Sequence, residues 1–189
     1  MKLYGSYTSP FVRHVRIVLQ ETRQACEFIE TDQAGSAVKS PTQRVPFLED
    51  GDIFLTDSAS IIKYLREKAG QAFCKSAQEL DQLCLVNTAL DATVNLFFLK
   101  RDGVAISQVP YLQRQAARVQ TTLAELDQSA ITHIAADGQF NDAQLRLGCF
   151  MGWSKFREQL DFSAFANLEK FYLQIANYPA FSSTQPPES

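Results

Sequence analysis

Residues 45–58 read Val-Pro-Phe-Leu-Glu-Asp-Gly-Asp-Ile-Phe-Leu-Thr-Asp-Ser, and this stretch decides the fold of the first part of the chain. Two short apolar runs, 45–48 and 53–55, flank a polar tetrapeptide that contains Asp50-Gly51. Asp-Gly between two apolar runs is a strong signal for a β-hairpin. Asp57-Ser58 then stand directly before a helical apolar pattern and are typical helix-capping residues. The stretch therefore predicts two antiparallel strands followed by a helix.

The residues before this stretch predict a β-α-β unit. The run 2–7 is short, apolar and aromatic, which favours a strand, and 27–31 alternates polar and apolar residues as a second strand would. Between them, Ser9-Pro10 opens a segment with apolar residues at helical spacing, namely Phe11, Val15, Val18 and Leu19. With the polar loop after residue 31, the order becomes β-α-β, loop, β-β-α within about 70 residues.

After residue 77 the apolar spacing is helical throughout. Long helices are predicted over about 77–102 and 108–128, and a final one over about 163–177. Asn141 and Gln144 have the spacing of a capping box, which marks another helix start. The segment 68–78 contains Gly70 and few large apolar residues, so it is the predicted linker. The sequence thus indicates a small α/β domain over 1–72 and an all-helical domain over 78–189.

Composition excludes several classes of function. The 189 residues have 46% hydrophobic content, which argues against disorder, and a net charge of −3, which provides no basic surface for nucleic acid. No run approaches the ~20 apolar residues of a membrane helix, and residues 1–6 lack the apolar core of a secretory signal. The four cysteines are dispersed and there are only two histidines, so no metal site is predicted. We expect a soluble cytoplasmic protein.

Five segments, in the same order along the chain, resemble those of the glutathione transferase family. They are Gly5-Ser6-Tyr7-Thr8-Ser9-Pro10-Phe11-Val12-Arg13, residues 40–48 with Val45-Pro46, residues 56–65 with Asp57-Ser58, the capping box over 140–145, and Tyr178-Pro179-Ala180-Phe181. The first of these segments is similar to the N-terminal segment of one bacterial group of the family. Three positions depart from the family pattern: Ser40 stands where Asn is usual, Gln43 where Gly is usual and Gln144 where Asp is common. Gln43 leaves the path of its loop open, whereas Gln144 can still close a capping box.

The resemblance implies a thioredoxin-like N-terminal domain with a mixed sheet, followed by an all-α domain. It also implies an enzyme that conjugates glutathione to small electrophiles in detoxification, as a homodimer with glutathione as cosubstrate and no metal. The alternative is a binding or regulatory protein that keeps the fold without turnover. An isomerase of the maleylacetoacetate type is disfavoured because its Ser-Ser-Cys start is absent. Without a cysteine at 8–10, glutaredoxin-like disulfide reduction is disfavoured as well.

Ser9 is the predicted catalytic residue. A serine followed by proline at the first helical position is an ordinary N-cap, and that alone explains its presence. By resemblance, its hydroxyl would also donate to the glutathione thiolate at the positive end of the helix. Thr8 and Tyr7 are alternatives for this role, although Tyr7 ends a strand and packing explains it better.

The other predicted glutathione contacts also follow from the resemblance. A cis Val45–Pro46 peptide would present the backbone of Val45 to the peptide-like ligand, whereas a proline that merely starts an edge strand needs no ligand. Ser58 would receive the γ-glutamyl carboxylate and Asp57 would hold the α-ammonium, while helix capping is the simpler explanation for both. Arg44, or less readily Lys39, would reach the glycyl carboxylate.

Two further groups of side chains are noted without a role. Arg13 and His14 are expected on the exposed side of the first helix or near a partner surface. Several aromatic residues at helical spacing could line an apolar site, but most such residues simply form core: Phe97, Phe98, Tyr111, Phe150, Trp153 and Phe156.

Overall fold

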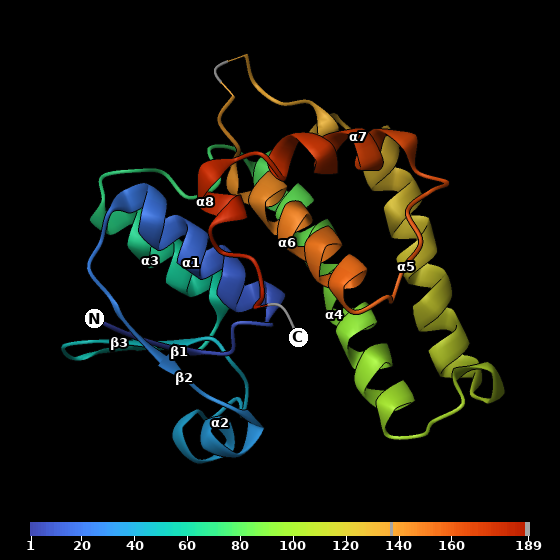
Figure 1. Cartoon of the computed structure of the whole chain (residues 1–189), viewed down its shortest axis with the longest axis horizontal. Coiled ribbons are helices and arrows are strands. Elements are labelled where there is room, and N and C mark those ends of the chain that lie inside the picture. The colour runs from blue at the N-terminus through green and yellow to red at the C-terminus, as the bar shows by residue number, and fades with distance from the viewer. Residues whose placement is uncertain (137, 188–189) are drawn as a thin grey trace. The chain divides into compact units, whose positions relative to one another are not determined.

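The computed structural model describes residues 1–136 and 138–187, which form two compact units. One unit comprises Met1–Lys75 together with Ala176–Ser189, and the other comprises Ser76–Ile175. Figure 1 shows the first unit around a small sheet and the second built from helices. Each unit is described here by itself.

The first unit is built on a four-stranded mixed sheet with strand order β2-β1-β3-β4. The strands are β1 (Lys2–Gly5), β2 (Glu27–Glu30), β3 (Phe47–Asp50) and β4 (Ile53–Leu55). β1 pairs with β2 in parallel, whereas β1 with β3 and β3 with β4 are antiparallel. The helices are α1 (Pro10–Thr22), α2 (Gln33–Lys39) and α3 (Ser58–Lys68). The predicted hairpin and β-α-β unit are confirmed.

Helix α2 is a correction, because the sequence predicted only a polar loop between β2 and β3. Asp32 caps this helix: its carboxylate accepts the N–H of Gly35 at 2.7 Å. Ser36 is its one buried residue among the seven. A helix of this kind has no apolar stripe, so hydrophobic periodicity does not detect it.

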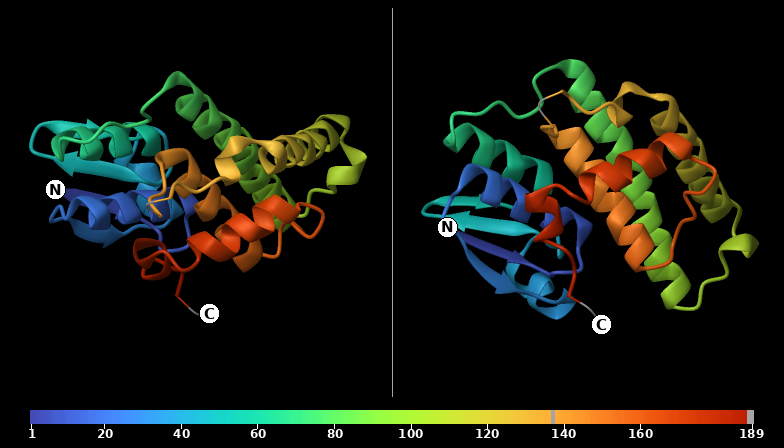
Figure 2. Two further views of the ribbon diagram at one scale, coloured as in Figure 1. Left: turned by 90° about the horizontal axis from the view of Figure 1, so that it is seen from above. Right: turned by 45° about the horizontal axis from the view of Figure 1, so that its top comes forward.

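The core of the first unit lies between the sheet and helices α1 and α3. Figures 1 and 2 show these two helices side by side over the same face of the sheet. The apolar stripes of both helices meet the inward-facing strand residues in a fully buried cluster of Leu3, Val15, Val18, Leu48, Ile61, Ile62 and Leu65. On the opposite face, Tyr4 stacks on Phe47 with ring centroids 4.4 Å apart, and Lys39 of α2 lies over the Tyr4 ring.

Gly5 is required where β1 passes closest to α1. A Cβ atom at this position would lie 2.6 and 2.8 Å from the two methyl carbons of Val12, which is fully buried and β-branched. Gly5→Ala should therefore lower the free energy of unfolding by about 1–3 kcal/mol, as measured by urea denaturation. In the double variant with Val12→Ala, which removes both methyl groups, the loss should be smaller than the sum of the two single losses. Additive losses would show that the close approach is not the cause.

The C-terminal segment belongs with the first unit, which corrects the predicted domain boundary of 78–189. Helix α8 (Pro179–Ser182) contacts α1. Arg13 donates from Nη2 to the Phe181 carbonyl at 2.8 Å, and its guanidinium lies 3.7 Å from the centre of the Phe181 ring. Arg13 and His14 are accordingly buried, so their expected place on the exposed side of the helix was wrong. For Arg13, the reason is that its partners Phe181 and Thr184 lie about 170 residues away in the sequence.

Tyr178, in the same segment, donates its hydroxyl to Glu21 Oε1 at 2.6 Å. Burial, and then this hydrogen bond with the carboxylate, raise the pKa of the Tyr178 phenol well above its usual range. The unfolded chain therefore loses the proton near the ordinary tyrosine pKa of about 10, while the folded chain keeps it. This contribution to stability is present below pH 10 and is lost as the pH rises above it. In Tyr178→Phe, the stability measured between pH 9 and 11 should fall less steeply than in the wild type; equal slopes would contradict this.

The second unit consists of four main helices: α4 (Ala77–Arg101), α5 (Pro110–Gln128), α6 (Asp142–Phe156) and α7 (Ala166–Ile175). Single 3-10 turns lie at Ile106–Gln108 and Ala130–Thr132. Helix α4 packs against both α5 and α6. The capping box is confirmed, since Asn141 Oδ1 accepts the N–H of Gln144 and Gln144 Oε1 accepts the N–H of Asn141. The predicted final helix, 163–177, is shorter and spans 166–175.

Helix α4 is also long and apolar enough to cross a membrane by length and composition. This is weak evidence, since the central helix of a helical domain meets the same criteria. Leu83, Val86 and Leu90 of α4 are buried, and α5 and α6 pack against the helix.

Candidate functional site

The register of the sheet brings three chain segments of the first unit to one end. Tyr4 of β1 pairs with Phe47 of β3, and Leu48 of β3 pairs with Leu55 of β4. The turn after β1, the loop before β3 and the segment after β4 therefore leave the sheet at the same end. Neighbouring strands lie roughly 5 Å apart, so these segments are close together. They contain all six residues predicted to bind glutathione: Ser9, Arg44, Val45, Pro46, Asp57 and Ser58.

Ser9 is the N-cap of helix α1. Its Oγ accepts the N–H of Val12 at 3.3 Å, and Pro10 occupies the first helical position. The predicted capping role is thus confirmed. A hydroxyl has one donor hydrogen and two acceptor lone pairs, and this bond uses a lone pair only. Ser9 is half-buried at the positive end of a thirteen-residue helix, so the geometry permits its hydroxyl to donate to an anion.

The two alternatives to Ser9 have other contacts. The Thr8 hydroxyl pairs with the Ser6 hydroxyl at 3.1 Å, and the Thr8 N–H donates to the same Ser6 oxygen. The Tyr7 ring packs on Phe28 with centroids 4.6 Å apart, and the Arg16 guanidinium lies 4.8 Å from the Tyr7 ring centre. Packing therefore accounts for Tyr7, as the sequence favoured. The catalytic role of Ser9 itself stays a prediction.

The Val45–Pro46 peptide is cis, as the resemblance implied. The loop that leads to it is held by hydrogen bonds: the Gln43 N–H donates to the Ser40 carbonyl at 2.9 Å, and the Ser36 hydroxyl donates to the Gln43 carbonyl. Gln43 has a φ of 52°, in the left-handed region. This conformation favours glycine, which is usual here in the family pattern, and glutamine adopts it in this chain.

Asp57 and Ser58 form the start of helix α3. Asp57 Oδ1 accepts the N–H of Ala59 at 2.8 Å and that of Ser60 at 3.2 Å, which confirms capping. Ser58 is the first helical residue and is buried. An anion at this helix N-terminus would meet backbone N–H groups and the positive end of the helix dipole. The Arg44 side chain is exposed, whereas Lys39 Nζ lies 4.9 Å from the Tyr4 ring centre.

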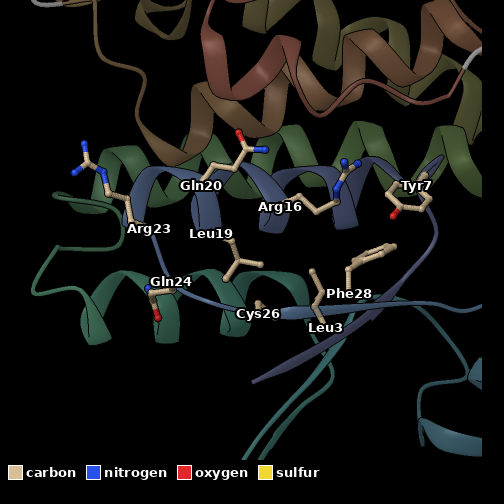
Figure 3. A pocket seen from close by; sticks show the side chains of 9 residues that line it. All are labelled: Leu3, Tyr7, Arg16, Leu19, Gln20, Arg23, Gln24, Cys26 and Phe28. Carbon is tan, nitrogen blue, oxygen red and sulfur yellow. The ribbon is translucent and has the colours of Figure 1, made fainter.

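A separate pocket of about 440 Å³ lies along α1 and the edge strand β2. Figure 3 shows the Tyr7 and Phe28 rings near each other at one end, with Arg16 from α1 beside them. None of the six predicted glutathione contacts lines this pocket. Burial raises the pKa of the Cys26 thiol, which is one of the groups that line this pocket.

The searched part of the chain, 1–136 and 138–187, has no group of three or more histidine, cysteine or acidic side chains that could hold a metal ion. The predicted lack of a metal stays a prediction.

The chain has a mixed-sheet domain with a cis-proline loop and a helical unit, and its fold is similar to that of a solved glutathione S-transferase. Residues 3–73 match the family model of the glutathione S-transferase N-terminal domain.

Individual relatives extend the similarity to the whole chain. The uncharacterized GST-like protein YibF of Escherichia coli is 26% identical, with 100% of each chain covered, which confirms the bacterial group that the N-terminal run indicated. Glutathione S-transferase Z2 of Arabidopsis thaliana is 26% identical over 98% of this chain and 91% of its own. A crystal structure of a Methylobacillus flagellatus glutathione S-transferase with glutathione bound has a TM-score of 0.84 at 25% identity, covering 98% of this chain and 99% of the other.

Proposed function

We propose that the protein is a glutathione transferase that conjugates the glutathione thiolate to small electrophiles. The proposal rests mainly on one observation. The half-buried Ser9 at the start of α1, the cis Val45–Pro46 peptide and the buried Ser58 all belong to segments at the same end of the sheet. The glutathione bound to the Methylobacillus relative supports the choice of ligand.

In this proposal each segment binds one part of glutathione. The backbone of Val45 pairs with the cysteinyl backbone of the ligand, which adds an extended strand beside the loop. Ser58 and the N-terminus of α3 receive the γ-glutamyl carboxylate, and Asp57 holds the α-ammonium. Arg44 pairs with the glycyl carboxylate. Ser9 donates to the thiolate.

A comparison of free energies shows whether Ser9 and the N-terminus of α1 can keep the glutathione thiol ionised at pH 7. A thiol with a pKa of about 8.5 is only about 3% ionised at pH 7. Lowering the pKa to about 6.5 makes the thiolate the major form and needs about 2.7 kcal/mol. A helix N-terminus supplies about 0.3–1 kcal/mol and a hydrogen bond to a charged group about 1.5–3 kcal/mol. Both together meet the requirement, so the hydroxyl is the larger contributor. Electrostatic stabilisation of the nucleophile and proximity then account for catalysis.

The test is glutathione binding by calorimetry together with conjugation of a generic aryl halide. We expect binding and turnover, with a conjugation rate that rises with pH until the bound thiol is ionised. Binding without turnover of any electrophile in a panel would favour the alternative, a non-catalytic or regulatory protein of the same fold. Robust glutathione-dependent disulfide reduction would contradict the proposed reaction, because residues 8–10 at the start of α1 contain no cysteine.

The remaining parts of the proposal are a cytoplasmic location, a role in detoxification and assembly as a homodimer. The dimer is tested by light scattering on the purified chain, where a mass of one protomer would contradict it.

A further inference from the structure

The ends of α4 and α6 in the helical unit bring together four aromatic rings and one arginine, here called the Arg157 cluster: Phe97, Phe98, Trp153, Phe156 and Arg157. The Phe97 ring meets the Trp153 ring edge-on, with centroids 5.6 Å apart and planes at 84°. The Phe98 ring lies 5.3 Å from Phe97. The Arg157 guanidinium carbon is 4.8 Å from the centre of Phe156 and 5.7 Å from that of Phe97. Both distances are within the range of cation–π contacts.

Arg157 differs from the other cations of this region in its charge environment. Its Nε is buried and has no hydrogen-bond partner, and no ion pair of the described residues includes Arg157. By contrast, Arg101 Nε lies 3.3 Å from the Asp102 carboxylate, and Lys155 Nζ lies 2.7 Å from Glu169. Buried N–H groups nearly always have an acceptor. A half-buried guanidinium with an unpaired buried N–H is therefore unusual.

Two features attract the Arg157 guanidinium to this position, and neither of them is an ion pair. Arg157 directly follows the last residue of α6, where the negative end of the helix dipole attracts a positive charge. The faces of Phe97 and Phe156 attract it as well. Neither feature provides a carboxylate, and the rings provide no strong acceptor. The guanidinium fork matches the geometry of a carboxylate, with which it forms two parallel hydrogen bonds.

We propose that the Arg157 cluster binds compounds that carry both a planar aromatic ring and a carboxylate. The carboxylate pairs with the Arg157 guanidinium, and the ring packs against the half-buried Phe97 and Phe98 rings, next to the buried Trp153. Because all five residues lie in the helical unit, this binding site goes beyond the proposed glutathione site, and it holds whether or not the protein is a transferase.

Trp153 offers a direct readout because it is the only tryptophan of the chain. The experiment titrates the full chain, without glutathione, with 4-nitrobenzoate and separately with 4-nitrobenzamide, and follows quenching of tryptophan fluorescence. The two probes share the ring and differ in charge. We expect saturable quenching by 4-nitrobenzoate with an affinity at least about tenfold higher than that of 4-nitrobenzamide. Equal affinities, or no saturable quenching by 4-nitrobenzoate, would overturn the proposal.

Two substitutions sharpen the test. Arg157→Gln should reduce 4-nitrobenzoate binding to the level of 4-nitrobenzamide while leaving 4-nitrobenzamide binding unchanged. Arg101→Gln is the matched control, because Arg101 also lies over a ring of the cluster, 4.8 Å from Phe98, but is paired with Asp102. It should leave both affinities unchanged. Undiminished 4-nitrobenzoate binding in Arg157→Gln would overturn the proposal. If that variant fails to fold, the comparison of the two probes on the wild type decides alone.

Discussion

Ser9→Ala should slow glutathione conjugation about 3- to 25-fold at pH 7. The substitution removes a hydrogen bond to the thiolate worth about 1.5–3 kcal/mol, which raises the pKa of the bound thiol by about 1–2 units. At pH 7 the fraction of reactive thiolate then falls from about 76% to about 3–24%. Because the ammonium and carboxylate contacts of glutathione remain, binding of the ligand should weaken much less than the rate. The measurement is kcat/KM for an aryl halide, together with the glutathione dissociation constant.

Ser9 also caps α1, so the loss of the cap must be separated from the loss of the donor. The Ala variant loses about 1 kcal/mol of stability with the cap, which thermal unfolding reports independently of the rate. Ser9→Thr keeps a hydroxyl and a capping side chain and should retain most of the activity. Thr8→Ala is the neighbouring control, since its hydroxyl pairs with Ser6. A larger loss of rate in Thr8→Ala than in Ser9→Ala would assign the thiolate to Thr8 instead.

Glu21→Ala should lower the free energy of unfolding by about 3 kcal/mol, the lower end of the cost of removing one partner from a buried ion pair. Glu21 Oε2 lies 2.6 Å from Arg66 Nη2, and these side chains are 12% and 10% exposed. Glu21 Oε1 also accepts the Tyr178 hydroxyl. The substitution leaves the Arg66 cation without this partner between α1 and α3, and it removes the Tyr178 contact of the C-terminal segment with α1. Urea unfolding measures the effect.

The exposed pair Lys63–Glu67 on α3 is the matched control. Both side chains are 56% exposed, and an exposed pair at this spacing contributes about 0.3–0.5 kcal/mol. Glu67→Ala should therefore be nearly neutral. Similar losses in Glu21→Ala and Glu67→Ala would contradict the structural role of the Glu21–Arg66–Tyr178 cluster.

The fold of the first unit was largely predictable because its signals are local. The Asp50-Gly51 turn, the caps at Ser9 and Asp57, and the apolar periodicity of α1 and α3 each act within a few residues. Helix α2 was not predictable from periodicity, because Ser36 is its one buried residue and no apolar stripe marks it. The ends of the long helices were predicted only to within a few residues, because capping residues and apolar spacing do not define them more closely.

The parts that sequence reasoning missed depend on contacts between distant residues. Arg13 was expected on the exposed side because charged residues are rarely buried without a partner. Its partners, Phe181 and Thr184, lie at the other end of the chain. The C-terminal segment was assigned to the helical domain for the same reason. Residue spacing does not reveal such pairs.

The candidate site was predictable in its residues but not in its arrangement. The resemblance selected Ser9, Val45-Pro46 and Asp57-Ser58, whereas the strand register of β1, β3 and β4 shows why they leave the sheet at one end. The Arg157 cluster could not be assigned from spacing, since aromatic residues at helical spacing are mostly core. The contact that distinguishes it is the cation–π pairing of Arg157 with Phe97 on another helix.

The most direct test of the central claim, that Ser9 and the start of α1 stabilise a glutathione thiolate, is the pH titration of the thiol of bound glutathione. Thiolate absorbance in the ultraviolet is followed in the wild-type complex, in the Ser9→Ala complex and in free glutathione. We predict a midpoint near pH 6.5 in the wild-type complex, about two units below the ordinary thiol value of about 8.5. In the Ser9→Ala complex the midpoint should rise most of the way back towards 8.5. A wild-type midpoint that stays near 8.5, or one that Ser9→Ala leaves unchanged, would contradict it.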